Sequence, residues 1–108
     1  MPKFLHQWTY KEEQVRAMVV DRQKRHDVVR VAIEAFGGKL LHFYFCFGEY
    51  DGVAISEFDD NETALACLMT IYGQGRLHTL KTTPLFTPEQ SQKAIELAWD
   101  QVGNPATT

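Results

Sequence analysis

The chain has 108 residues, a mass of 12.4 kDa and a formal net charge of −3, with 44% hydrophobic and 23% charged residues. This length fits one compact domain and excludes a multidomain enzyme. The composition is that of an ordinary globular protein, which excludes disordered, collagen-like and coiled-coil classes.

Charge and hydropathy also bear on partners and location. The pI near 5.7, with no basic stripe beyond residues 22–25, predicts that the chain does not bind nucleic acid. No apolar run approaches the roughly 18 residues of a membrane span, and residues 1–4 lack a signal-peptide pattern. We therefore expect a cytoplasmic protein with no membrane partner.

The first third of the chain predicts a strand followed by a helical region. Aromatic residues predict a strand over residues 3–9. Between Glu12 and Phe36, apolar residues recur at intervals of three and four, which predicts one long helical region, with a break near Asp21 left open. Gly37 and Gly38 end this region, because glycine adopts a left-handed conformation without steric cost.

Residues 39–47 carry the strongest strand pattern of the chain. Because side chains alternate between the two faces of a strand, we expect an apolar row toward the helices and an amphipathic row on the other face of the sheet. The apolar row is Leu41, Phe43, Phe45 and Phe47, and the amphipathic row is Leu40, His42, Tyr44 and Cys46. A turn over residues 48–52 leads into a partner strand over residues 53–58.

The remainder predicts a helix, a strand and a terminal helix. Residues 59–62 form a helix start, with an aspartate as N-cap and Glu62 placed to reach back to it, and residues 73–75 end this helix. A weaker strand follows over residues 76–83, and Thr87, Pro88 and Gln90 form a capping box. The apolar stripe of the first of these helices is Ala64, Leu65, Leu68, Met69 and Tyr72. The apolar stripe of the terminal helix is Ala94, Ile95, Ala98, Trp99 and Val102.

The element order βαββαβ followed by a terminal helix predicts an α+β fold with ferredoxin-like topology. We expect a four-stranded antiparallel sheet of strand order 4-1-3-2, with the helices on one face and an extra C-terminal helix. Residues 1–103 form this single domain in the prediction, and residues 104–108 form a frayed tail.

A sheet with helices on one side leaves its other face open. An open face bearing leucine, tyrosine, cysteine and tryptophan would be a larger apolar patch than monomers keep. A second copy packed face to face covers it and gives a homodimer, or a higher oligomer, with a cavity between the sheets. The alternative cover is the terminal helix, folded back so that Trp99 meets the sheet.

Several short motifs in one order carry a family resemblance. They are Trp8-Thr9, Phe36-Gly37-Gly38-Lys39, Phe47-Gly48-Glu49-Tyr50-Asp51 with Val53-Ala54, Asp59-Asp60, and Phe86-Thr87-Pro88-Glu89. Over about residues 4–90 the chain resembles the GYD domain family. The resemblance implies a dimeric α+β barrel and no agreed activity, so it supplies no catalytic residue. Gln23 stands where the family often has proline, which favours a helix that runs past Asp21 without a kink.

The histidines and cysteines are the candidates for metal chemistry. His6, His42 and His78 fall on predicted strands, where imidazoles can converge on a metal or a haem iron, but each comes from a different strand. The spacing of Cys46 and Cys67 fits neither a zinc site nor a disulfide framework. We therefore predict no metal and no cofactor. Both thiols are expected to be buried, with reactivity left open for Cys46.

The candidate site lies on the open face of the sheet. The candidate catalytic groups are His42 and Asp51, with Glu49 as an alternative acid or base. The candidate ligand-binding residues are His6, Trp8, Tyr44 and Tyr50. The alternative interpretation is that residues 49–51 only build the hairpin turn.

Two functions remain open at this stage, beside a purely structural oligomer. A small-molecule-binding protein needs only apolar walls and a few hydrogen-bond donors in its cavity. A cofactor-independent enzyme, such as an isomerase, lyase or oxygenase acting on a small substrate whose aromatic character is left open, needs an ionisable group of perturbed pKa there.

Overall fold

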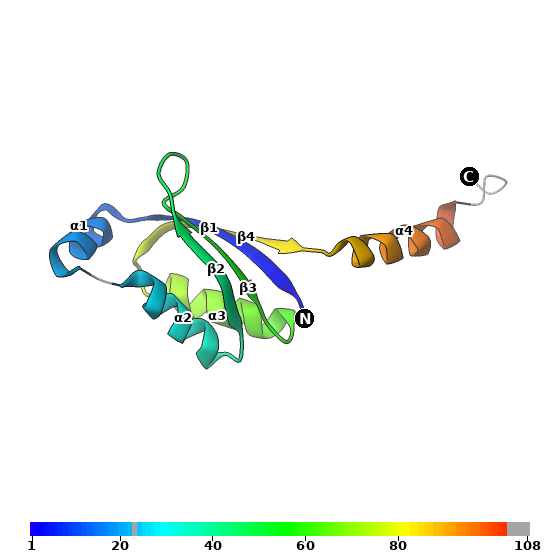
Figure 1. The fold of residues 1–108 in the computed structure, drawn as a ribbon, viewed down its shortest axis with the longest axis horizontal. Coiled ribbons are helices and arrows are strands. Elements are labelled where there is room, and N and C mark those ends of the chain that lie inside the picture. Colours follow the sequence, from blue (N-terminus) through cyan, green and yellow to red (C-terminus); the bar gives the residue numbers. More distant parts are fainter. Residues whose placement is uncertain (23, 104–108) are drawn as a thin grey trace.

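The structure is a computed structural model that describes residues 1–22 and 24–103 (Figure 1). Its strands are β1 (Lys3–Tyr10), β2 (Lys39–Phe45), β3 (Gly52–Glu57) and β4 (Leu77–Leu85). Its helices are α1 (Glu12–Asp21), α2 (Arg25–Ala35), α3 (Asn61–Gly73) and α4 (Pro88–Val102). The element order is the predicted one, except that two helices replace the single helical region after β1.

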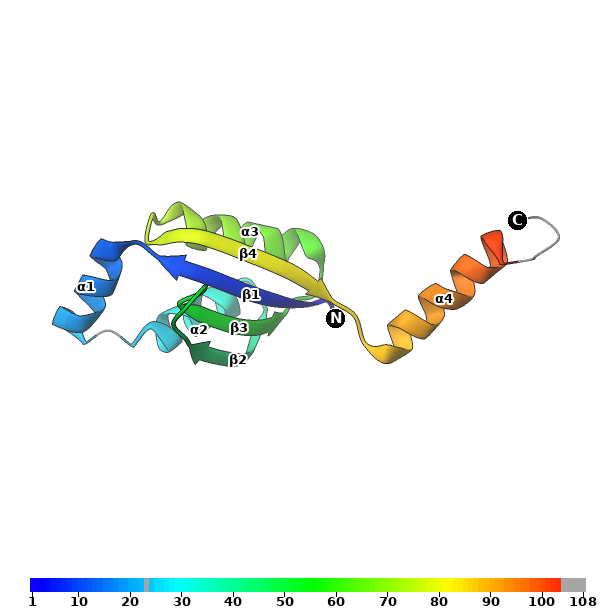
Figure 2. The same ribbon diagram turned by 90° about the horizontal axis from the view of Figure 1, so that it is seen from above.

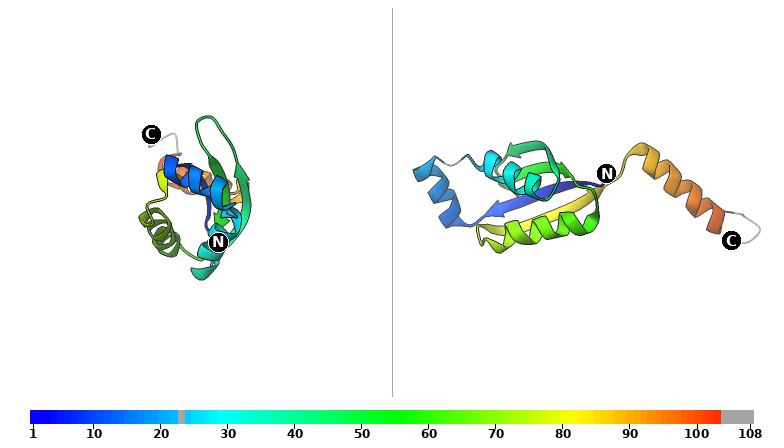
Figure 3. Two further views of the ribbon diagram at one scale, coloured as in Figure 1. Left: turned by 90° about the vertical axis from the view of Figure 1, so that its left-hand side faces the viewer. Right: turned by 90° about the horizontal axis from the view of Figure 1, so that it is seen from below.

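The strands form one antiparallel sheet in the order β2-β3-β1-β4. This is the predicted ferredoxin-like order, read from the opposite edge. β1 therefore lies inside the sheet, paired with β3 on one side and β4 on the other. Helices α2 and α3 cover one face of the sheet, as Figures 2 and 3 show. We call the opposite face the open face.

The side chains of β1 alternate strictly between the two faces. Those beneath the sheet are buried, and they are Phe4, His6, Trp8 and Tyr10. On the same side, Phe4 packs with Ile33 of α2 and Phe58, while Trp8 and Tyr10 pack with Leu77 of β4. The core is therefore the layer between the sheet and the two helices.

An irregularity in β2 changes which side chains face the helices. Leu40 pairs with Ser56 and His42 with Ile55, so that Leu41 is an extra residue in this strand. Such a bulge moves a side chain to the other face of the sheet. Leu40 consequently packs against the core, against prediction, whereas His42 and Tyr44 lie on the predicted open face.

The end of the β2–β3 hairpin extends beyond the helices, where it projects from the body of the molecule (Figure 1). Phe43 packs on the core as predicted. Phe45 is 56% exposed and Phe47 is 98% exposed, so the predicted burial of both is wrong. Cys46 is also exposed, again against prediction, while Cys67 is buried as predicted. Leu41, at the bulge, is exposed as well.

The helical region after β1 breaks at Arg22. This residue ends α1 in the left-handed conformation, with φ of 53°, and α2 starts at Arg25. The break that the sequence left open near Asp21 is therefore present, and the unkinked helix that the family comparison favoured is wrong. Because the chain turns here, α1 stands away from the sheet and α2 lies under it (Figure 2).

The side of helix α3 that faces the sheet agrees only in part with the predicted stripe, of which Ala64 is buried and Leu68 lines the cavity beneath the sheet. Ala64 and Cys67 are buried against the core, while Leu65, Met69 and Tyr72 of the predicted stripe are exposed. This helix is apolar nearly all round, so its apolar spacing did not decide which side is buried. Asp60 caps it by accepting a hydrogen bond from the Thr63 backbone N–H at 2.7 Å. Glu62 is one position too early to complete the predicted capping box.

Helix α4 begins with the predicted capping box. The Gln90 N–H donates to Thr87 Oγ1 at 3.1 Å, and the Thr87 N–H donates to Gln90 Oε1 at 2.8 Å. No residue of α4 is buried, and the helix leads away from the body of the molecule (Figures 1 and 2). It therefore does not cover the open face of its own chain. The frayed tail predicted for residues 104–108 lies outside the described residues, and one domain over residues 1–103 stays a prediction.

None of the helices described for residues 1–22 and 24–103 is both long and apolar enough to cross a membrane.

Replacing Gly52 by alanine is expected to destabilise the protein by about 1–3 kcal/mol, because overpacking a close-packed site has this cost. The new Cβ would overlap the indole ring of Trp8, which lies directly on Gly52. Gly73→Ala is the matched control, because apart from its chain neighbours and the backbone of its own helix no described atom lies within 4 Å of its Cβ position. Urea unfolding measures both variants. A midpoint for Gly52→Ala equal to that of the parent would contradict this packing.

Candidate binding site beneath the sheet

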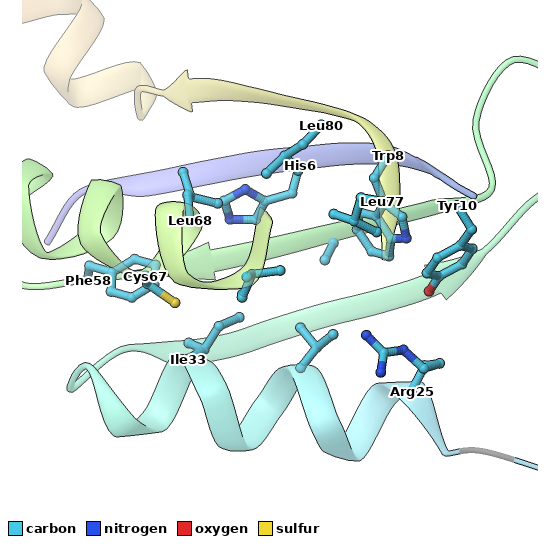
Figure 4. A pocket seen from close by; sticks show the side chains of 13 residues that line it. His6, Trp8, Tyr10, Arg25, Ile33, Phe58, Cys67, Leu68, Leu77 and Leu80 are labelled. Atoms are coloured by element: carbon cyan, nitrogen blue, oxygen red, sulfur yellow. The ribbon is translucent and has the colours of Figure 1, made fainter. Parts of the chain in front are cut away.

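A small cavity lies between the sheet and helices α2 and α3 (Figure 4). Its volume is about 40 Å³. A water molecule needs about 10–15 Å³ on this measure, so the cavity holds a group of a few heavy atoms. Most of its wall is apolar, but polar side chains enter it from β1 and from the first residue of α2.

β1 supplies His6, Trp8 and Tyr10, because alternate residues of this strand point beneath the sheet. α2 supplies Arg25, which is only 4% exposed. Figure 4 shows Tyr10 and Arg25 pointing toward one another at one end of the cavity, with Trp8 beside them. Cys67 and Phe58 lie at the other end.

His6 is a buried and fully hydrogen-bonded histidine. Its Nε2 bonds to Ser56 Oγ at 2.6 Å, and its Nδ1 bonds to Thr82 Oγ1 at 2.9 Å. Because one nitrogen of a neutral imidazole donates and the other accepts, the two hydroxyls fit the neutral ring. Burial lowers the pKa of His6 from its ordinary value of 6.5 to about 4. His6 is therefore uncharged at neutral pH.

Three other polar atoms of the cavity wall have no hydrogen-bond partner within the described chain. They are Trp8 Nε1, Tyr10 Oη and Arg25 Nε. Arg25 also makes no ion pair with any acidic residue in ranges 1–22 and 24–103. Leaving a buried donor unpaired costs about 1–3 kcal/mol, and an unpaired charge costs more. Three such groups at one end of one cavity make this the candidate binding site.

Asp51 holds the part of β1 that carries Trp8 and Tyr10. Its backbone N–H donates to the Trp8 carbonyl at 2.8 Å, and its carboxylate accepts from the Tyr10 N–H at 2.8 Å. Both bonds run from the hairpin to β1 and not within the turn. In this structure Asp51 therefore positions the backbone of β1, and its catalytic role stays a prediction.

The structure divides the predicted site between the two faces of the sheet. His6 and Trp8 are buried beneath it, whereas His42 and Tyr44 lie on the open face, with rings stacked at 6.4 Å and 10°. The prediction that all four line one pocket is therefore wrong. The physical reason is the alternation of side chains along β1. The residues at its even positions, which include His6 and Trp8, all point to the helices. Tyr50 is half-buried in the turn and does not line the cavity.

Sequence reasoning missed Tyr10 and Arg25. Tyr10 has the same parity as Trp8, so assigning Trp8 to the core would have brought Tyr10 with it. Arg25 gave no usable signal, because it lies in a run of charged residues typical of a solvated helix. Its burial follows from the break at Arg22, which turns the start of α2 beneath the sheet.

The described histidine, cysteine, aspartate and glutamate side chains do not gather in any group of three or more that could hold a metal ion. Burial raises the pKa of the Cys67 thiol to about 11, so this residue is an inert thiol at neutral pH.

A four-stranded antiparallel sheet in this order, with helices on one face, defines a ferredoxin-like α+β protein. Two solved structures share this fold. FFRP-DM1 is 17% identical, with a TM-score of 0.53, over 80% of this chain and 100% of that chain. At3g17210 from Arabidopsis thaliana is 12% identical, with a TM-score of 0.52, over 81% of this chain and 95% of that chain.

The family model of the GYD domain matches residues 4–95, and the chain therefore belongs to the GYD domain family, as the motifs predicted. No curated protein sequence matches the chain.

The stability of the protein is expected to depend on pH through His6. Between pH 6.5 and about 4 the unfolded chain binds a proton at this residue and the folded chain does not. The free energy of unfolding is therefore highest above pH 6.5, falls as the pH falls, and levels off below pH 4, a total loss of about 3 kcal/mol.

Urea unfolding between pH 4 and 7 measures this dependence in the parent and in His6→Gln, whose amide can still bond both hydroxyls. His78→Gln is the control, because His78 is exposed. Identical slopes in the parent and in His6→Gln would show that His6 is not held neutral by the fold.

Proposed function

We propose that this GYD-family chain is a small-molecule-binding protein that works as a homodimer or a higher oligomer. The observation that carries the proposal is the cavity beneath the sheet, with three unpaired polar atoms on one end of its wall. Ligand sites are concave and mostly apolar, with a few placed polar groups, and this cavity has that composition. The ligand cavity predicted from the sequence lay instead on the open face.

Two surfaces support the oligomer. The first is the open face, where Leu5 and Ile55 lie side by side in register and Tyr44 is 62% exposed. The second is α4, whose 15 residues are all exposed. Helices of 12–15 residues are marginal alone in water, so α4 gains most by packing its stripe of Ile95, Trp99 and Val102 on another copy. In such an assembly His42 and Tyr44 lie at or near the contact.

No observation favours the enzyme alternative to the same degree. The one histidine in the cavity is neutral and bonded through both nitrogens, and the Asp51 carboxylate accepts a hydrogen bond from the Tyr10 backbone N–H. Binding without chemistry therefore needs fewer assumptions than an isomerase, lyase or oxygenase.

A retained ligand is the direct test of small-molecule binding. Native mass spectrometry of the protein as purified is expected to show added mass on the 12.4 kDa chain that denaturation releases. Ala54→Val places two methyl groups in the cavity wall and is expected to remove that mass. Ala66→Val is the control, because Ala66 is exposed on α3. Equal mass before and after denaturation, together with no thermal stabilisation by a small-molecule panel, would count against binding.

Light scattering at micromolar protein concentration is expected to give a molecular mass of about 25 kDa or more, twice the 12.4 kDa mass of one chain. Ile55→Lys places a charge at the centre of the open face and is expected to shift the mass toward that of one chain. Val31→Lys, on the outer side of α2, is the control for an added lysine. A parent protein that scatters as a single chain would refute the oligomer.

A further inference from the structure

We propose that the cavity beneath the sheet takes a small aliphatic monocarboxylate, with Arg25 as its counter-ion and Tyr10 and Trp8 as hydrogen-bond donors. This inference rests on the proposed small-molecule binding and adds the chemical class of the ligand. It does not depend on the oligomeric state.

Arg25 supplies the charge. Its side chain lies beneath the sheet, almost completely buried, and no acidic residue of the described chain neutralises it. The neighbouring Asp27 pairs instead with His26 and Arg30 on the outer side of α2. A guanidinium presents its N–H groups in a fork that matches the two oxygens of a carboxylate. An anion in the cavity is thus the group that this buried cation lacks.

Tyr10 and Trp8 supply two further donors at the same end of the cavity. Their rings meet edge to face, with centroids 6.3 Å apart. The hydroxyl of Tyr10 and the indole N–H of Trp8 are both buried without a partner in the described residues. An indole N–H can only donate, so the missing partner at Trp8 is an acceptor. The indole N–H and the guanidinium can only donate, and the Tyr10 hydroxyl can donate as well, so a charged acceptor group such as a carboxylate fits this end of the cavity better than an amide or an alcohol.

The apolar lining, the volume and the charge of the cavity indicate what the rest of the ligand is. Apolar side chains that include Ile33, Leu68 and Ile71 line the rest of the cavity, which suits a short alkyl chain. The volume of about 40 Å³ admits only a few heavy atoms. His6, the other ionisable group at the wall that could carry positive charge, is uncharged at neutral pH because burial lowers its pKa to about 4. One positive charge therefore selects a monoanion over a dianion.

The indole N–H resonance of Trp8 reports directly on the site. The chain has two tryptophans, and the spectrum of Trp99→Phe identifies the resonance of Trp8 by elimination. Sodium propionate, titrated at constant ionic strength, is expected to shift this resonance to saturation. Propionamide has nearly the same shape without the charge, and it is expected to bind at least tenfold more weakly, because hydrogen bonds to charged groups are the stronger ones.

Arg25→Met tests the counter-ion. It is expected to weaken propionate binding at least tenfold, whereas Lys24→Gln, which removes an exposed charge one residue away, changes it less than twofold. Without propionate, Arg25→Met is expected to unfold at a higher urea concentration than the parent, because it removes an uncompensated buried charge. With saturating propionate, the parent gains stability and Arg25→Met does not.

The outcomes separate this inference from the proposed function. Equal or tighter binding of propionamide would overturn the carboxylate and leave small-molecule binding intact. A lower urea midpoint for Arg25→Met without ligand would show that the fold already compensates the guanidinium, and it would overturn the role of Arg25. If neither compound shifts the indole N–H resonance of Trp8, the inference is overturned. Small-molecule binding as such is decided separately, by the ligand mass that the purified protein retains. The comparison of propionate with propionamide needs only the parent chain.

Discussion

The interior position of β1 is the constraint on which the layer beneath the sheet depends. This strand pairs with β3 along one edge and with β4 along the other, so a shift of one residue would break two ladders and turn every side chain to the wrong face. The position and direction of Trp8 and Tyr10 follow from this pairing. The break at Arg22 then brings Arg25 under the same strand, where it completes the polar end of the cavity.

A buried cation such as Arg25, for which residues 1–22 and 24–103 supply no counter-ion, is a cost to the fold that the apolar core must offset. The two clusters around Phe4 and Trp8 provide the burial for this, and His6 avoids adding to the cost by remaining neutral between Ser56 and Thr82. Stability and binding are therefore opposed at Arg25: the residue that lowers stability in the free protein is the one that gives the site its preference for an anion.

The fold was predictable because its signals are local and agree with one another. The aromatic strand at residues 39–47, the glycines after Phe36 and the capping box at Thr87 each fix an element, and their order fixes the topology. The site was less predictable, because it depends on long-range register. The bulge at Leu41 leaves no mark in the pattern of its strand, and α3 is apolar on every side. Arg25 is buried only because a helix breaks three residues earlier.

The two hydrogen bonds of Asp51 connect the exposed β2–β3 hairpin to β1, the strand that supplies Trp8 and Tyr10 to the cavity. Asp51 follows the hairpin tip that carries the exposed Phe47, and it forms hydrogen bonds with the backbone of β1 at both Trp8 and Tyr10. Cys46 is tied in as well, since its N–H donates to the Asp51 carbonyl at 2.9 Å. A displacement of the hairpin tip is therefore transmitted through these backbone hydrogen bonds to the part of β1 that carries Trp8 and Tyr10, two residues of the cavity wall.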